Sequence, residues 1–219
     1  MDPAAATLLQ QLRERLDADA AAWLDRSLTS IAEQPFVASR ALNAFALAAR
    51  KLRKAPPLEA TALPEQLRRV PDAGAGALAR VVLVAAAADA AGDGAAELVA
   101  ELYRQGDNDE RCAVLRALPM LHPPPQFVET AVNAVRSSVQ PIFEAVACDT
   151  GFAAEHFADG AFAQLVLKAL FVGVPLGRVQ GVRARTTPEL SRMAHGYASE
   201  RRAAGRSVPE DIATFFPAP

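Results

Sequence analysis

The chain has 219 residues, of which 23 are Lys or Arg and 25 are Asp or Glu, so its formal net charge is −2. This balance argues against a general nucleic-acid-binding protein, because such proteins gain most of their affinity by neutralising phosphates. The only cysteines, Cys112 and Cys148, lack the short spacing of a zinc knuckle and are too few for a disulfide scaffold.

The N-terminus and the apolar runs argue against export and membrane insertion. The N-terminal segment lacks the basic start, apolar block and cleavage site of a signal peptide. The longest strongly apolar run, residues 81–88, is far shorter than the ~20 residues that a membrane-spanning helix needs. We therefore expect a soluble, cytoplasmic protein with no membrane span.

Strong helix formers dominate the first half of the chain, and apolar residues recur there at three- and four-residue steps. This spacing predicts one long helix over residues 4–32, after the cap pair Asp2-Pro3. Asp107 is a good N-cap for a later helix. The other helices predicted in this half cover about residues 35–54, 64–70, 75–91, 95–104 and 107–118.

The second half begins after the prolines at residues 123–125 and has the same helical character. Helices are predicted at about residues 126–137, 139–148, 153–172, 188–204 and 209–216. No alternating apolar run bounded by a tight turn predicts a strand. We therefore expect an all-α fold without significant sheet. The helices should form an irregular stack of antiparallel hairpins, of the helical-bundle or α-solenoid-like type. We expect one domain over residues 1–219, with any subdomain break near residues 119–125.

Motifs for catalysis or metal binding are missing from the sequence. None of the three histidines lies three or four residues from another histidine or a cysteine, and the Glu-x-x-His and His-Glu-x-x-His patterns are absent. The glycines of AGAGALAR, residues 73–80, follow no predicted strand and precede no lysine–serine pair. We identify no catalytic residue, metal site or cofactor, and a non-enzymatic role is favoured.

Two charged residues stand alone in strongly apolar helices. Glu144 is the only charge in VQPIFEAVAC, and Lys168 is the only charge between residues 161 and 177. An unpaired buried charge costs several kcal/mol, so the two are predicted to form a structural ion pair, within salt-bridge distance or bridged by one water, with Gln164 adjacent, one turn before Lys168. The alternative is that Lys168 extends its ammonium to solvent.

The loop between two C-terminal helices holds Arg178, Arg183 and Arg185 and no acidic residue. In one interpretation, these arginines pair with distant carboxylates and fasten the last helices to the body. In the other, at least two of them join Lys168 and Gln164 in a concave site for a carboxylate or phosphate, which suits the planar guanidinium.

Several of these segments resemble a known family. PIFEAVA, QLVLKALFVGVPLGRVQGV and ELSRM followed by YASERRAAGRSVPED are similar to the C-terminal half of the EboA family of bacterial metabolite-traffic proteins. Three upstream segments also align in register with this family, although less strongly: FALAARKLRK, ALARVVLVAA and LYRQGDNDERCAVLRALPML. The resemblance therefore covers most of the chain, which resembles a divergent member of the family.

The resemblance implies a cytoplasmic helical protein encoded beside enzymes that move secondary-metabolite precursors toward the cell envelope. Its expected partners are proteins of the same operon, including a membrane prenyltransferase-like protein, and a small anionic metabolite. We expect a non-enzymatic accessory or adaptor protein that binds a partner or a small acidic-apolar metabolite. The alternatives are an enzyme acting on that metabolite in a helical pocket, or a pure helical-repeat scaffold.

Overall fold

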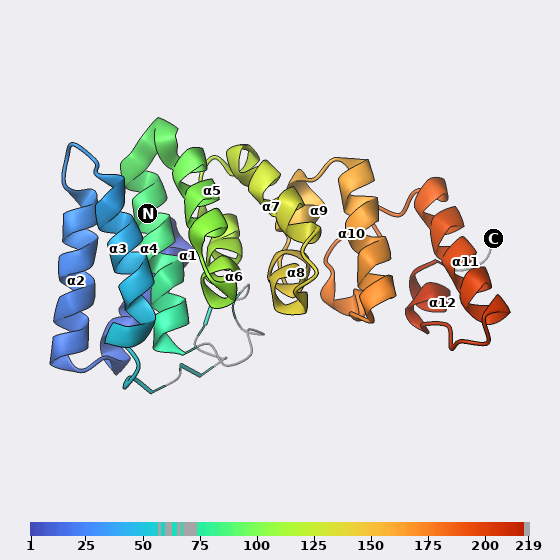
Figure 1. Cartoon of the computed structure of the whole chain (residues 1–219), viewed down its shortest axis with the longest axis horizontal. Coiled ribbons are helices and arrows are strands. Elements are labelled where there is room, and N and C mark those ends of the chain that lie inside the picture. Colours follow the sequence, from blue (N-terminus) through green and yellow to red (C-terminus); the bar gives the residue numbers. More distant parts are fainter. Residues whose placement is uncertain (57, 60–62, 65–66, 68–73, 217–219) are drawn as a thin grey trace. The chain divides into compact units, whose positions relative to one another are not determined.

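A computed structural model describes residues 1–56, 58–59, 63–64, 67 and 74–216. In this part of the chain every regular element is a helix and no strand is present, which confirms the predicted all-α fold (Figure 1). The chain forms two compact units, Met1–Asn133 and Ala134–Pro219, called unit 1 and unit 2 below. The expected single domain over residues 1–219, with any break near residues 119–125, stays a prediction.

Unit 1 is built around the apolar helix α4. Its α-helices are α1 (Pro3–Arg15), α2 (Ala18–Ala32), α3 (Ala38–Lys51), α4 (Ala75–Ala91), α5 (Ala95–Gln105), α6 (Asn108–Ala117) and most of α7 (Val128–Val135). Short 3₁₀ turns η3 (Gly92–Gly94), η4 (Leu118–Met120) and η5 (Pro124–Phe127) connect the later ones. Helices α1, α2, α3, α5 and α6 all pack against α4. The apolar run predicted to be central is therefore at the centre of this unit.

The same central position explains the hydropathy of α4. Among the described residues, the helical segment Ala75–Gln105 is long and apolar enough to cross a membrane by length and composition, because an 18-residue window within it has a mean hydropathy of 1.5. In its most apolar window, 61% of the residues are buried inside the protein. Nearly all side chains of α4 between Leu78 and Ala88 are covered by the surrounding helices. A helix that is buried on every side in a protein core is as apolar as a membrane-spanning helix, because neither is in contact with water.

One charged residue, Arg80, lies inside this core and is only 5% exposed. Its Nε donates to the carbonyl oxygen of Phe45 at 3.1 Å, and its Nη2 donates to Glu110 Oε1 at 2.7 Å. The guanidinium also lies 5.4 Å from the centre of the Phe45 ring. Glu110 closes a capping box with Asp107, which confirms Asp107 as the N-cap of α6. Arg80 therefore joins α3, α4 and the start of α6.

Unit 2 is smaller and less regular. Its helices are α8 (Gln140–Ala147), α9 (Phe152–His156), α10 (Asp159–Val172), the 3₁₀ turn η6 (Leu176–Arg178), α11 (Pro188–Ala203) and α12 (Asp211–Phe215). Helix α10 packs against α8, η6 and α11, and α12 packs against η6 and α11. Thr187 accepts a hydrogen bond from the backbone N–H of Leu190 and caps α11, with Pro188 as its first residue. Local capping residues thus fix where this last long helix begins.

Two long helices predicted from the sequence are each divided in the structure. The predicted helix over residues 4–32 is α1 and α2, because Leu16 is extended and the Asp17 side chain caps a new helix by accepting from Ala20 N–H. The predicted helix over residues 153–172 is α9 and α10, with extended residues Phe157 and Ala158 between them. The helix predicted over residues 64–70 falls mostly outside the described residues.

Close contact between α3 and α4 gives a test of unit 1. A Cβ added at Gly76 would lie 2.7 Å from the Cα of Ala49. This distance is too short for two carbon atoms, so the backbone of α3 would have to move away from α4. Gly76→Ala should therefore lower the free energy of unfolding by about 1–3 kcal/mol, as overpacking does. Urea denaturation measures the change. Gly94→Ala is the matched control, because nothing lies within 4 Å of its added Cβ, and it should shift stability by at most about 0.5 kcal/mol.

Candidate functional site

Arg178, the first of the three loop arginines, joins two carboxylates of unit 2. Its Nη1 donates to Glu144 Oε2 at 2.6 Å, and its Nε and Nη2 donate to Asp149 Oδ2 at 3.1 and 2.9 Å. The backbone N–H of Asp149 in turn donates to the carbonyl oxygen of Arg178 at 2.7 Å. All three side chains are mostly covered, with 28%, 25% and 11% exposed for Arg178, Glu144 and Asp149. This cluster fastens η6 to the end of α8.

The pKa values agree with a tight cluster. Burial alone would raise the pKa of the Glu144 carboxyl, but the hydrogen bonds from Arg178 and Gln140 outweigh it, and the pKa is lowered. Burial likewise disfavours the charged guanidinium of Arg178, yet its hydrogen bonds to Asp149 and Glu144 raise its pKa. Burial raises the pKa of the neighbouring Cys148 thiol to about 12. The thiol is therefore protonated at neutral pH and is a poor nucleophile.

Arg185 and Arg183 make different contacts. Arg185 Nη1 donates to the carbonyl oxygens of Ala153 and Ala154 at 3.2 and 3.0 Å, and its Nη2 donates to Asp159 Oδ1 at 2.6 Å. Its guanidinium also stacks 4.5 Å from the centre of the Phe162 ring. Arg183 is exposed and lies 4.7 Å from the centre of the Phe215 ring. Arg178 and Arg185 thus make the fastening contacts of the first interpretation.

Lys168 does not join these arginines. Its Nζ donates to the carbonyl oxygens of Val135 and Ser137 at 2.5 and 2.6 Å, and it lies 5.0 Å from the centre of the Phe143 ring. The structure brings Glu144 to Arg178, so the predicted pair between Glu144 and Lys168 is not formed as a direct ion pair. The reason is topological, because the loop returns Arg178 to the side of α8 on which Glu144 lies. Gln164 is exposed, one turn before Lys168.

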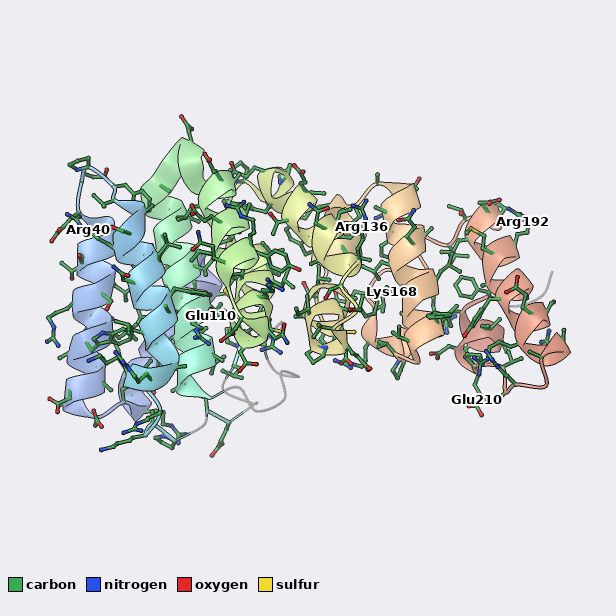
Figure 2. All side chains as sticks on the ribbon, viewed as in Figure 1. Arg40, Glu110, Arg136, Lys168, Arg192 and Glu210 are labelled. Carbon is green, nitrogen blue, oxygen red and sulfur yellow. The ribbon has the colours of Figure 1, made fainter. Side chains whose placement is uncertain are left out.

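A groove in unit 2 includes Lys168 in its wall. It has a volume of about 890 Å³ and lies between the α7–α8 connection, α10 and α11. Figure 2 labels Arg136 in the α7–α8 connection, Lys168 on α10 and Arg192 on α11. The lining residues are Arg136, Ser138, Leu167, Lys168, Phe171, Val172, Arg192, Met193, Gly196, Tyr197 and Glu200. Three cations and a single carboxylate therefore surround an apolar surface.

The apolar part of the groove is strongly exposed. Phe171 is 74% exposed and Met193 is 40% exposed, which is unusual for side chains of this size. The rings of Phe171 and Tyr197 face each other from α10 and α11 with centres 6.4 Å apart. Burial lowers the pKa of the Lys168 ammonium beside them. The arrangement combines a cationic edge with an apolar wall, which is suited to binding a molecule with both characters.

Only Lys168 of the five predicted ligand-binding residues lines this groove. Gln164, Arg178, Arg183 and Arg185 do not line it. Arg136, Arg192 and the aromatic wall were not predicted from the sequence. The helical spacing held part of the signal, because Phe171 follows Lys168 by one turn and Tyr197 follows Met193 by one turn. Among the described residues, no group of three or more His, Cys, Asp or Glu side chains could hold a metal ion.

The family match covers both units and therefore includes the groove. A family model described as metabolite traffic protein EboA matches residues 4–216. The chain belongs to the EboA family. This result confirms the resemblance seen in the sequence and associates the chain with metabolite traffic. No curated protein and no solved structure matches this EboA-family chain.

The Arg178 cluster gives a prediction for the stability of unit 2. Arg178→Ala leaves the Glu144 and Asp149 carboxylates largely covered and without their shared cation. The free energy of unfolding should fall by about 2–3 kcal/mol, somewhat less than for a fully buried pair. Chemical denaturation followed by circular dichroism measures it. Arg183→Ala is the matched control from the same loop and should cost at most about 1 kcal/mol, since it loses only a ring contact.

The lowered pKa of Glu144 predicts a pH dependence. Its ordinary value is 4.5, and the folded-state value is lower, so the carboxylate contributes stability that is full above pH 4.5 and is lost as the pH falls through the folded pKa. Wild type should be more stable than Glu144→Gln at neutral pH, and the difference should shrink as the pH drops below 4.5. Urea unfolding of both proteins over a pH series measures it. A difference that stays constant into the acid range would contradict the assignment.

Proposed function

We propose that this EboA-family chain is a non-enzymatic accessory protein of metabolite traffic that binds a small acidic-apolar metabolite in the groove of unit 2. The observation that carries the proposal is the groove itself, with three cations beside an exposed aromatic and aliphatic wall. Its volume of about 890 Å³ lies within the range of small-molecule sites.

Two further observations support binding rather than chemistry. The Cys148 thiol, the one cysteine close to the charged cluster of unit 2, has its pKa raised to about 12 by burial and does not supply a nucleophile. The loop arginines Arg178 and Arg185 already bind carboxylates and carbonyls of unit 2 itself. Lys168, Arg136 and Arg192 line the groove instead. In this proposal the protein works in the cytoplasm and exchanges the metabolite with proteins of the same operon, including a membrane prenyltransferase-like protein.

A second candidate is an adaptor that binds a protein partner through the same wall. The high exposure of Phe171 and Met193 favours it, because large exposed apolar side chains are enriched where proteins dock. The family name fits either function, since traffic requires both a cargo and a recipient. The two candidates differ in the size of what the groove retains.

Gly196 gives a clean test because it lines the groove and nothing lies within 4 Å of a Cβ added there. Gly196→Phe has open space for its Cβ and should place its ring in the groove, whereas Gly196→Ala should leave the groove open and stabilise α11 by roughly 0.5–1 kcal/mol. The binding of N-phenylnaphthylamine, a neutral fluorescent apolar probe, should weaken at least about tenfold in Gly196→Phe, a loss of about 1.4 kcal/mol. It should be unchanged in Gly196→Ala.

Native mass spectrometry of protein purified from its own host completes the test. A retained small molecule that is present in wild type and Gly196→Ala and absent in Gly196→Phe supports the metabolite. A retained polypeptide with the same dependence supports the adaptor instead. Equal probe binding by all three proteins would contradict a binding role for the groove.

A further inference from the structure

Lys168 is held in place before any ligand arrives. Its Nζ donates to the carbonyl oxygens of Val135, the last residue of α7, and Ser137. Carbonyl groups at the end of a helix lack partners within the helix and carry its partial negative charge, so an ammonium group is stabilised there. The ring of Phe143 adds a cation–π contact at 5.0 Å. The lysine side chain, normally flexible, has little freedom left at this position.

These contacts leave one donor. An ammonium group has three N–H bonds, and two of the three are directed to the carbonyl oxygens of Val135 and Ser137. The remaining N–H belongs to a side chain that lines the groove. The two acceptors are neutral, so the positive charge of Lys168 is retained. Partial burial makes an interaction with an anion stronger here than at an exposed lysine, since less water competes.

The other two cations of the groove differ in kind. Arg136 and Arg192 are both exposed. Arg192 forms an ion pair with Glu189, one turn earlier on α11, in which both side chains are more than 60% exposed. Exposed charges of this type attract an anionic ligand over a distance that shortens as the salt concentration rises. They contribute mainly to the rate at which the ligand associates with the protein. Glu200, the one carboxylate in the lining, lies two turns after Met193 on α11 and opposes ligands with a second negative charge at that end.

We infer that Lys168 determines which ligands the groove accepts, by donating one hydrogen bond to a single oxyanion head while the apolar body of the ligand lies against Phe171, Met193 and Tyr197. Arg136 and Arg192 steer the anion toward the groove and do not select it. This inference rests on the proposed function and adds the chemical class of the ligand, an amphipathic monoanion. A carboxylate has the required head, whereas a phosphate monoester carries up to two negative charges near neutral pH.

A pair of dyes that differ by one charged group tests the selection. Anilinonaphthalene sulfonate is N-phenylnaphthylamine with a sulfonate added, so the ratio of their dissociation constants reports the value of the anion alone. Wild type should bind the sulfonate at least about tenfold more tightly than the neutral dye, a difference of about 1.4 kcal/mol. Lys168→Gln keeps an amide donor for the helix-end carbonyls and removes the charge. It should bring the ratio close to one while the neutral dye still binds.

The ratio separates selection from folding. A variant with a collapsed groove loses both dyes, whereas a variant without selection loses only the preference. Lys168→Met provides a second variant without charge, and a melting curve for each protein records its stability. Arg192→Gln should keep the preference at low salt and reduce its dependence on ionic strength. Arg202→Gln, an exposed arginine of α11 that does not line the groove, is the matched control and should change neither.

Competition against the sulfonate dye compares a head group with one negative charge and a head group with up to two. Decanoate should displace the dye, and decyl phosphate, whose head carries up to two negative charges near neutral pH, should displace it more weakly. Decanol, which has no charge, should be at least about tenfold weaker than decanoate, equivalent to about 1.4 kcal/mol. If wild type binds the charged and neutral dyes equally and Gly196→Phe excludes both, the inference fails, and the part of the proposed function that stands is binding of an apolar molecule in the groove. If Gly196→Phe has no effect on either dye, both fail. A preference that survives in Lys168→Gln and disappears in Arg192→Gln would assign selection to the mouth of the groove and overturn the role of Lys168.

Discussion

A guanidinium removed from water must find acceptors, and this requirement ties together segments of the chain that are distant in sequence. In unit 1, Arg80 binds groups that lie 35 and 30 residues away, on α3 and α6. In unit 2, Arg178 binds carboxylates that lie 34 and 29 residues before it. An unpaired charge in either place costs several kcal/mol, so alternative packings that separate these groups are strongly disfavoured. Alanine-rich helices make few large side-chain contacts of their own, and the arginines add the specificity that small residues lack.

The features that were predictable from the sequence are those that depend on neighbouring residues. Asp107 and Thr187 cap their helices through backbone N–H groups three residues ahead, so the local sequence contains the whole interaction. The position of α4 was predictable for a related reason, because only the centre of a helical unit accommodates a helix that is apolar on every side. The break at Asp17 was missed, although Asp17 is itself an N-cap. The apolar stripe continues across it and outweighed the cap in the prediction.

The partners of isolated charges were not predictable in the same way. Glu144 and Lys168 each stand alone in an apolar helix, and the sequence shows that each needs a partner without showing which one. The structure gives Glu144 the guanidinium of Arg178 and gives Lys168 two backbone carbonyl groups. Backbone acceptors leave no trace in a sequence, because every residue carries one. Arg136 and Arg192 were missed for a further reason, since each is an ordinary surface cation until α10 and α11 place it at the edge of the same groove.

The arginine loop and the groove are linked by charge. Arg178 takes both Glu144 and Asp149, so the glutamate predicted to neutralise Lys168 is held elsewhere. Among the described residues, Lys168 forms no ion pair, and its hydrogen-bond acceptors are neutral. A carboxylate beside Lys168 would convert the groove into a neutral apolar surface that has no preference for acids. By binding Glu144 of α8, the Arg178 cluster keeps one positive charge in the wall of the groove. The fastening of the loop and the capacity of the groove to recognise an anion are thus two results of one pairing choice.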